Sequence, residues 1–179
     1  DKIAIIAKNR PEWVFVDLAV QKTGAVLTPI YPTIGENELE FILQDASVKL
    51  IIMNDESFMD KISPISERIP LLKTLYTFEP SETIPNWKDL MKGITPEDLK
   101  NLEESASKVG NKDLATMIYT SGTTGRPKGV MLSHNNILSN VLDSMPCFPP
   151  GENLRALSFL PLNHIFERMI IYIYLFKGV

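Results

Sequence analysis

The residues whose types and spacing most clearly suggest a chemical role form one run from Thr120 to Lys128. It reads Thr-Ser-Gly-Thr-Thr-Gly-Arg-Pro-Lys. The run combines four hydroxyl side chains with two glycines and a lysine. Glycine adopts positive φ without steric cost, so successive backbone N–H groups can turn toward a single anion. Lys128 adds a compact positive charge of the kind that binds phosphate oxygens. The run is therefore a candidate phosphate-binding loop.

The main alternative for a run rich in Ser, Thr and Gly is a flexible linker. Apolar segments flank this run closely on both sides, from Thr116 to Tyr119 and from Gly129 to Leu132, as expected for a loop between two strands. The spacing also disfavours two common nucleotide motifs. A P-loop needs a second glycine five residues after the first, where Pro127 stands, and the dinucleotide pattern G-x-G-x-x-G is absent. Walker-type NTPases and Rossmann dehydrogenases are therefore disfavoured.

Three segments carry a resemblance to one known family. Every position from Thr120 to Lys128 resembles the signature loop of the adenylate-forming enzymes, which include acyl-CoA synthetases, luciferases and peptide-synthetase adenylation domains. Residues Leu157 to Arg168 resemble the next core motif of that family in its long-chain fatty-acid variety. The start of the family's N-terminal region is similar to Asn9–Trp13, Gly24–Val26 and Tyr31–Thr33. The resemblance covers nearly the whole chain.

The resemblance implies a long-chain fatty-acid–CoA ligase that uses ATP, Mg²⁺ and coenzyme A. A fatty acid would be activated to an acyl-adenylate and transferred to coenzyme A, giving acyl-CoA, AMP and pyrophosphate. Two alternatives remain: an adenylate-forming ligase for aryl or amino acids, which the segment His164–Arg168 disfavours, and a non-catalytic α/β module that binds nucleotide or a protein partner. The expected partners are small-molecule substrates and not nucleic acid, and the oligomeric state stays open.

The resemblance also assigns roles to individual residues. Lys128 and His164 are the catalytic candidates, because Lys128 would neutralise phosphate charge and His164 would lie beside the acyl group and the adenylate. Thr120 is the candidate magnesium contact, since a hydroxyl oxygen is a suitable hard ligand. The nucleotide-binding set is Thr120, Ser121, Gly122, Thr123, Thr124, Gly125 and Lys128.

Some of these residues also have simpler explanations. From its residue type alone, His164 is better explained as a half-buried structural histidine. Glu167 and Arg168 either brace the same region or pair with each other on a helix surface. The remaining histidine, His134, is expected in the first turn of a helix, and two histidines with the single Cys147 do not make a convincing zinc site.

Composition limits the class of protein independently. The chain has 179 residues, of which 44% are hydrophobic and 22% charged, as expected for one compact globular domain. A net charge of −4 argues against a general nucleic-acid surface. The single cysteine excludes an internal disulfide and favours a reducing compartment, so we expect cytoplasmic localisation, with peripheral membrane association left open. The apolar run Met169–Leu175 is too short to span a bilayer.

The chain is expected to be a fragment of a longer enzyme, because it begins at Asp1 without an initiator Met and ends directly after an apolar run. The resemblance implies that it is part of an N-terminal adenylation (AMP-binding) domain and is inactive alone. We expect three parts: first βα units over 1–78, a polar helical connection over 79–112, and a phosphate-loop unit with an acyl-site motif over 113–179.

The candidate residues must be positioned by the strands and helices around them, and the sequence shows strand and helix patterns in alternation. They predict an α/β fold with a partial doubly wound, mostly parallel sheet flanked by helices. Helix-start signals are Pro11, a Thr33–Glu36 capping box, Thr95–Asp98 and Ser133. The expected strands cover 3–7, 25–30, 48–53, 72–78, 116–119, 128–132 and 154–160. The expected helices cover 11–23, 33–45, 57–68, a segment after 95, 134–143 and a segment from 164.

Overall fold

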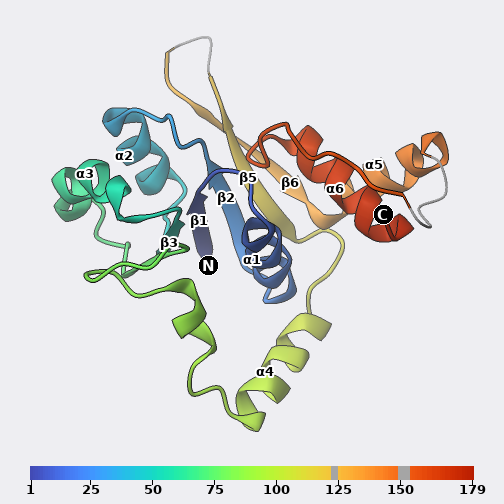
Figure 1. Ribbon diagram of the computed structural model, residues 1–179, viewed down its shortest axis with the longest axis horizontal. Helices are drawn as coiled ribbons and strands as arrows, with labels where there is room; N and C mark the ends of the chain where they lie inside the picture. The colour runs from blue at the N-terminus through green and yellow to red at the C-terminus, as the bar shows by residue number, and fades with distance from the viewer. Residues whose placement is uncertain (122–124, 149–153) are drawn as a thin grey trace.

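A computed structural model describes residues 1–121, 125–148 and 154–179. Within these residues, strands form one sheet in the order β4-β3-β1-β2-β5-β6 (Figure 1). Strands β1 to β5 run parallel to their neighbours, and β6 is antiparallel to β5. The bounds are β1 Lys2–Ile6, β2 Val26–Ile30, β3 Leu50–Met53, β4 Thr74–Thr77, β5 Leu114–Thr120 and β6 Lys128–Ser133. The mostly parallel α/β sheet is confirmed.

Helices cover both faces of this sheet, as expected of a doubly wound fold. The α-helices are α1 Pro11–Lys22, α2 Glu36–Asp45, α3 Met59–Ile62, α4 Pro96–Ser107, α5 His134–Ser144 and α6 Ile165–Lys177. Short 3₁₀ helices are η1 Glu56–Phe58, η2 Ser63–Arg68, η3 Trp87–Met91 and η4 Met145–Cys147. Helix α4 buries no residue and stands away from the sheet, consistent with a solvated polar connection (Figure 1).

Alternation along β1 explains how the two faces are built. Ala4 and Ile6 pack into a core with α2 and α3, whereas Ile5 and Ala7 pack into a second core with α1. Successive side chains of a strand point to opposite faces, so a continuous apolar run fits a strand covered on both sides. A third, smaller core joins Ala115 of β5 to α5 and α6.

Several residues that predict helix starts are found at helix starts in the structure. Pro11 occupies the first turn of α1, where its missing N–H leaves no hydrogen bond unmade. Thr95 and Asp98 form a reciprocal capping box at α4, and Ser133 forms one with Asn136 at α5. His134 is accordingly the first residue of α5.

Three expectations are wrong. Helix α2 begins after Gly35 with no side-chain cap, so Thr33 and Glu36 do not form a capping box. Residues 57–68 form η1, α3 and η2 rather than one helix, because Pro64 has no N–H to continue the helical ladder. Residues 154–160 form no strand, since no described strand pairs with them, and Leu157 and Phe159 remain 80% and 71% exposed.

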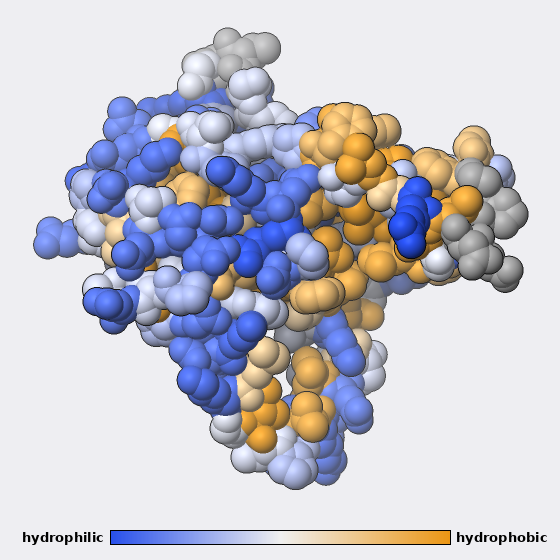
Figure 2. Space-filling model, in the orientation of Figure 1, coloured by the Kyte–Doolittle hydropathy of each residue, from blue (hydrophilic) through white to orange (hydrophobic). Residues whose placement is uncertain are grey.

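Apolar side chains gather on the side of the molecule that carries α6 (Figure 2). Exposed apolar residues of α5 and α6 include Leu138, Leu142, Leu175 and Phe176. Most of Met169–Leu175 is half-buried in α6, and only Ile173 is fully enclosed. Along the described residues, none of the helices has the length and apolar character needed to cross a membrane.

Candidate functional site

The candidate phosphate-binding loop lies at the tip of the hairpin formed by β5 and β6. Thr120 and Lys128 are paired across the last rung of the ladder, so the hairpin brings the two ends of the loop together. Because β5 runs parallel to β2, this tip lies beyond the carboxyl edge of the parallel strands (Figure 1). Open α/β sheets bind ligands at this edge.

Most of the described residues of the loop are exposed to solvent. Thr120, Ser121, Gly125 and Lys128 are exposed. Gly125 has a φ of +82°, a backbone conformation that favours glycine. Gly122, Thr123 and Thr124, also expected to bind nucleotide, lie outside the described residues.

A buried tyrosine anchors the base of the loop. The Tyr119 hydroxyl donates a hydrogen bond to Asp45 Oδ2 over 2.5 Å, and its ring packs edge-on against Phe41 with centroids 6.5 Å apart. Burial raises the pKa of Tyr119, and the Asp45 carboxylate raises it further, so the phenol remains a hydrogen-bond donor. The contact ties the end of β5 to the end of α2.

Gly129 allows the two strands of the hairpin to pack closely at this point. A Cβ atom there would lie 3.1 Å from Tyr119 Cζ and 3.2 Å from Met117 Sδ, closer than ordinary van der Waals contact. Tyr119 and Gly129 are also register partners, so the ring lies over the glycine backbone. The bare backbone of Gly129 therefore makes room for the tyrosine that anchors the loop.

We expect Gly129→Ala to lower the free energy of unfolding by about 1–2 kcal/mol, because the new methyl group must displace Tyr119 or Met117. Urea denaturation followed by circular dichroism measures the change. Gly110→Ala is a matched control, since its Cβ would lie 3.7 Å from Asp113 Oδ2, an ordinary contact. Equal stability of the two variants would contradict this packing argument.

His164 is the N-cap residue of α6 and is exposed. Its Nδ1 accepts a hydrogen bond from the Phe166 backbone N–H over 3.2 Å. We assign the neutral imidazole's proton to Nε2 from this hydrogen bond, because Nδ1 acts as an acceptor. Nε2 is then the donor that His164 can offer to a bound molecule.

Asn9 fixes the segment that leads into His164. Its Nδ2 donates to the Leu160 carbonyl over 2.7 Å, and its Oδ1 accepts from the Leu162 N–H over 2.9 Å. One side chain thus satisfies two backbone groups that lie about 150 positions away in the sequence. The contact joins two segments on which the family resemblance rests.

A second link joins the same segments inside the core. Trp13 Nε1 donates to Asn163 Oδ1 over 3.3 Å, and Asn163 Nδ2 donates to the Ala7 carbonyl over 3.4 Å. Ala7 directly follows β1, so Asn163 sits at the carboxyl end of that strand. His164 and the base of the phosphate loop therefore lie at the same edge of the sheet.

Glu167 and Arg168 are both buried, and they do not pair with each other on a helix surface. Glu167 accepts a hydrogen bond from Ser158 Oγ over 2.6 Å, and Arg168 forms an ion pair with Asp17 of α1 over 2.6 Å. The surface-pairing alternative is therefore wrong, and each residue instead contacts another segment of the chain. Sequence reasoning did not single out Asp17, which has no local motif.

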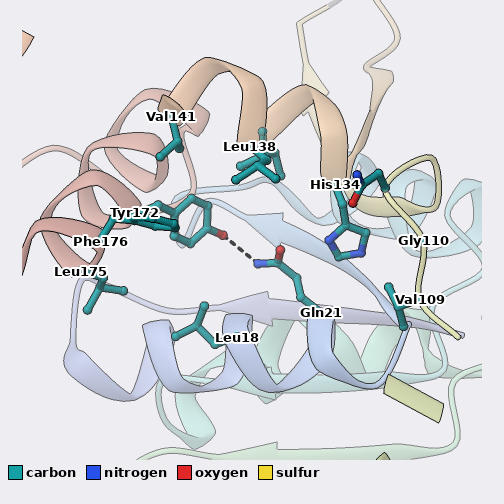
Figure 3. Close-up of a pocket in the computed structure, with 12 residues that line it drawn as sticks. Leu18, Gln21, Val109, Gly110, His134, Leu138, Val141, Tyr172, Leu175 and Phe176 are labelled. Atoms are coloured by element: carbon teal, nitrogen blue, oxygen red, sulfur yellow. Dashed lines mark hydrogen bonds between the residues drawn. The ribbon is translucent and has the colours of Figure 1, made fainter. Parts of the chain in front are cut away.

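A separate apolar pocket of about 360 Å³ lies between α1, α5 and α6 (Figure 3). Gln21 donates to the Tyr172 hydroxyl at its wall over 2.8 Å, and the His134 ring also faces the pocket. None of the lining residues is a candidate phosphate-loop residue, and His134 follows β6 at the edge opposite the loop. The pocket is therefore distinct from the candidate site.

Comparison with known proteins decides the family. A family model described as AMP-binding enzyme matches residues 1–179. The chain belongs to this family. It is 32% identical to long-chain-fatty-acid–CoA ligase 5 of Mus musculus, over 94% of this chain and 26% of the relative. It is also 32% identical to fatty acyl-CoA synthetase A of Dictyostelium discoideum, over 99% of this chain and 28% of the relative.

Two solved structures share the fold. The luciferase-like enzyme of the mealworm Zophobas morio superposes with a TM-score of 0.80 at 23% identity, covering 99% of this chain and 40% of that one. ATP-bound MatB from Rhodopseudomonas palustris superposes with a TM-score of 0.67 at 26% identity, covering 97% and 33%. The chain spans about a quarter of the length of the curated relatives it matches.

Proposed function

We propose that this AMP-binding chain supplies the ATP phosphate site and part of the acyl site of a long-chain fatty-acid–CoA ligase. The observation that carries the proposal is the position of the Thr120–Lys128 run: Thr120 and Lys128 pair at the carboxyl edge of the sheet, and both are exposed. Family membership supports adenylate chemistry, and the relatives named as long-chain-fatty-acid–CoA ligases support the substrate class. The ATP-bound MatB structure supports nucleotide binding by this fold.

The proposed first step joins two anions. A carboxylate oxygen of the fatty acid attacks the α-phosphorus of ATP, the bond to the bridging oxygen breaks, and pyrophosphate leaves. Lys128 and the N–H and hydroxyl donors of the loop would bind the β- and γ-phosphates, so that positive charge meets the negative charge that pyrophosphate gathers. The coenzyme A thiol then attacks the acyl carbon and releases AMP.

The described residues are compatible with a magnesium ion held mainly by ATP. Among the described residues no group of three or more His, Cys, Asp or Glu side chains could hold a metal ion. Thr120 offers an exposed hydroxyl beside Lys128, and Mg²⁺ commonly takes few protein ligands together with substrate phosphates. When bound, the ion adds positive charge beside the pyrophosphate.

His164 would act on the acyl side of the site. Its exposed Nε2–H can donate a hydrogen bond to the carboxylate or to the acyl-adenylate carbonyl as they come to the carboxyl edge of the sheet. The hydrogen bonds made by Asn9 and Trp13 hold its segment in place before substrate arrives. Such preorganisation is what a hydrogen-bond donor needs to stabilise developing charge.

The substrate proposal is tested with the full-length protein that contains this chain. It is incubated with ATP, Mg²⁺, coenzyme A and carboxylic acids, and products are identified by mass spectrometry. We expect acyl-CoA from long-chain fatty acids, with little product from aryl or amino acids. Residues 1–179 alone serve as the control and should give none. Preferred use of an aryl or amino acid would overturn the substrate class.

A further inference from the structure

Arg168 is a buried charge that the proposed chemistry leaves without a role. Only 1% of the residue is exposed. Its Nη2 and Nε donate to the two carboxylate oxygens of Asp17 over 2.6 and 3.2 Å, and its Nη1 donates to Thr116 Oγ1 over 2.9 Å. The guanidinium also lies over the Trp13 ring, 5.5 Å from its centroid.

The contacts of Arg168 join three elements that carry the candidate site. Asp17 belongs to α1, and Thr116 belongs to β5, the strand that ends at Thr120. Thr116 Oγ1 in turn donates to the Leu27 carbonyl of β2 over 2.7 Å. Arg168 itself lies one helical turn after His164, whose carbonyl accepts its backbone N–H over 3.3 Å. One side chain therefore connects the helix of His164 to the strand of the phosphate loop.

Stability alone does not explain a buried ion pair. The cost of desolvating two charges offsets much of their attraction, so well-packed apolar side chains are often as stable. A guanidinium differs from an apolar group because its planar fork fixes direction as well as distance. Here the fork uses separate nitrogens for Asp17 and for Thr116, which restricts rotation of α6 about its axis.

The charge on Arg168 is also permanent. Burial opposes the charged form, but the carboxylate of Asp17 and the hydroxyl of Tyr172 raise the pKa of Arg168 above its ordinary value. The Tyr172 hydroxyl completes the cluster by donating to Asp17 and accepting from Arg168. A group that keeps its proton cannot act as a general base, which leaves a structural or positioning role.

We propose that Arg168 is a positioning residue that holds His164 in register with the phosphate-binding loop, through its forked pair with Asp17 and its hydrogen bond to Thr116. The proposal rests on the ligase function proposed above. It predicts that losing the fork misplaces His164, while the loop still binds ATP because the ladder between β5 and β6 pairs its two ends, Thr120 and Lys128.

The experiment measures fatty-acid-dependent ATP–pyrophosphate exchange by the full-length protein. Arg168→Met and Arg168→Lys are each made alone and together with His164→Ala. We expect Arg168→Met to lower kcat about 10–100-fold, with KM for ATP changed less than about twofold, because small displacements of a catalytic group are costly. Arg168→Lys keeps the charge near Asp17 but not the fork, and should show a smaller loss of kcat.

The double variants distinguish positioning from general stability. If Arg168 acts through His164, then Arg168→Met should have little further effect when His164 is already alanine. Ile62→Ala is the control: it opens the core between α3 and the opposite face of the sheet and should lower the thermal midpoint without lowering kcat.

Two results would overturn the positioning role while leaving the ligase function standing. An equal loss from Arg168→Met with and without His164 would show that the two residues act independently. An unchanged kcat in both Arg168 variants would show that the fork is not needed. If Arg168→Met does not fold, the same comparison is made with Arg168→Lys. Wild-type protein without any exchange would overturn the ligase function itself, and the positioning role with it.

Discussion

Lys128→Ala should slow fatty-acid-dependent ATP–pyrophosphate exchange by the full-length protein by about 10²–10³-fold, the usual cost of losing one preorganised charge-stabilising donor. Lys128 is exposed at the end of the phosphate loop and pairs in register with Thr120. Its ammonium would meet the β- and γ-phosphates, where negative charge gathers as pyrophosphate departs. The loss should therefore fall mainly on kcat.

A neighbouring positive charge provides the control for this prediction. Arg126 is exposed in the same loop, two residues from Lys128, and has no proposed contact with the phosphates. Arg126→Ala removes the same net charge and should leave the exchange rate within about threefold, since an exposed charge is well screened. If both variants lose activity equally, general attraction of ATP explains the effect and the specific role of Lys128 is wrong.

Trp13→Ala should lower the free energy of unfolding by about 3–5 kcal/mol, a large part of the usual stability of a domain. Trp13 is 0% exposed, packs in the core beneath α1 and donates to Asn163. Its removal leaves a cavity and an unsatisfied amide near His164. Trp13→Phe should cost less, because a six-membered aromatic ring still fills part of the space, although the five-membered ring and its N–H are lost.

The other tryptophan of the chain gives the comparison. Trp87 is half-buried and packs edge-on against Phe78, with centroids 5.7 Å apart. Trp87→Ala should cost about 1–2 kcal/mol, because part of its ring is already in water. Urea denaturation measures both variants. A Trp13→Ala variant no less stable than Trp87→Ala would show that the contacts between the Asn9–Trp13 and Leu160–His164 segments do not stabilise the fold.

The regular elements could be predicted where the signal is local. The apolar run from Ile3 predicts a buried strand, and Pro11, Thr95 and Ser133 mark helix starts, because each effect depends on neighbours in the chain. The segment 154–160 fails for the opposite reason. A strand needs a partner to satisfy its backbone, and apolar composition does not tell whether that partner is present.

In the candidate site, too, the residues of local motifs could be predicted and their distant supporting residues could not. The loop was found from its residue types, and the resemblance pointed to His164. Its supports were not found, since Asp45 anchors Tyr119 across 74 residues of sequence and Asp17 binds Arg168 across 151. For an isolated aspartate in a helix, the sequence alone predicts a solvent-exposed charge on the surface. Only the folded sheet shows which partner each one meets.

We propose that this loop serves formation of an acyl-adenylate, and an oxygen-isotope experiment distinguishes that intermediate from an acyl phosphate. The full-length protein is supplied with a fatty acid whose carboxylate carries a heavy oxygen isotope, together with ATP, Mg²⁺ and coenzyme A. A carboxylate oxygen that attacks the α-phosphorus stays with AMP when the thiol displaces it. We predict one labelled oxygen in the AMP. Label found in inorganic phosphate, with ADP as the nucleotide product, would show that an acyl phosphate forms and that no acyl-adenylate does.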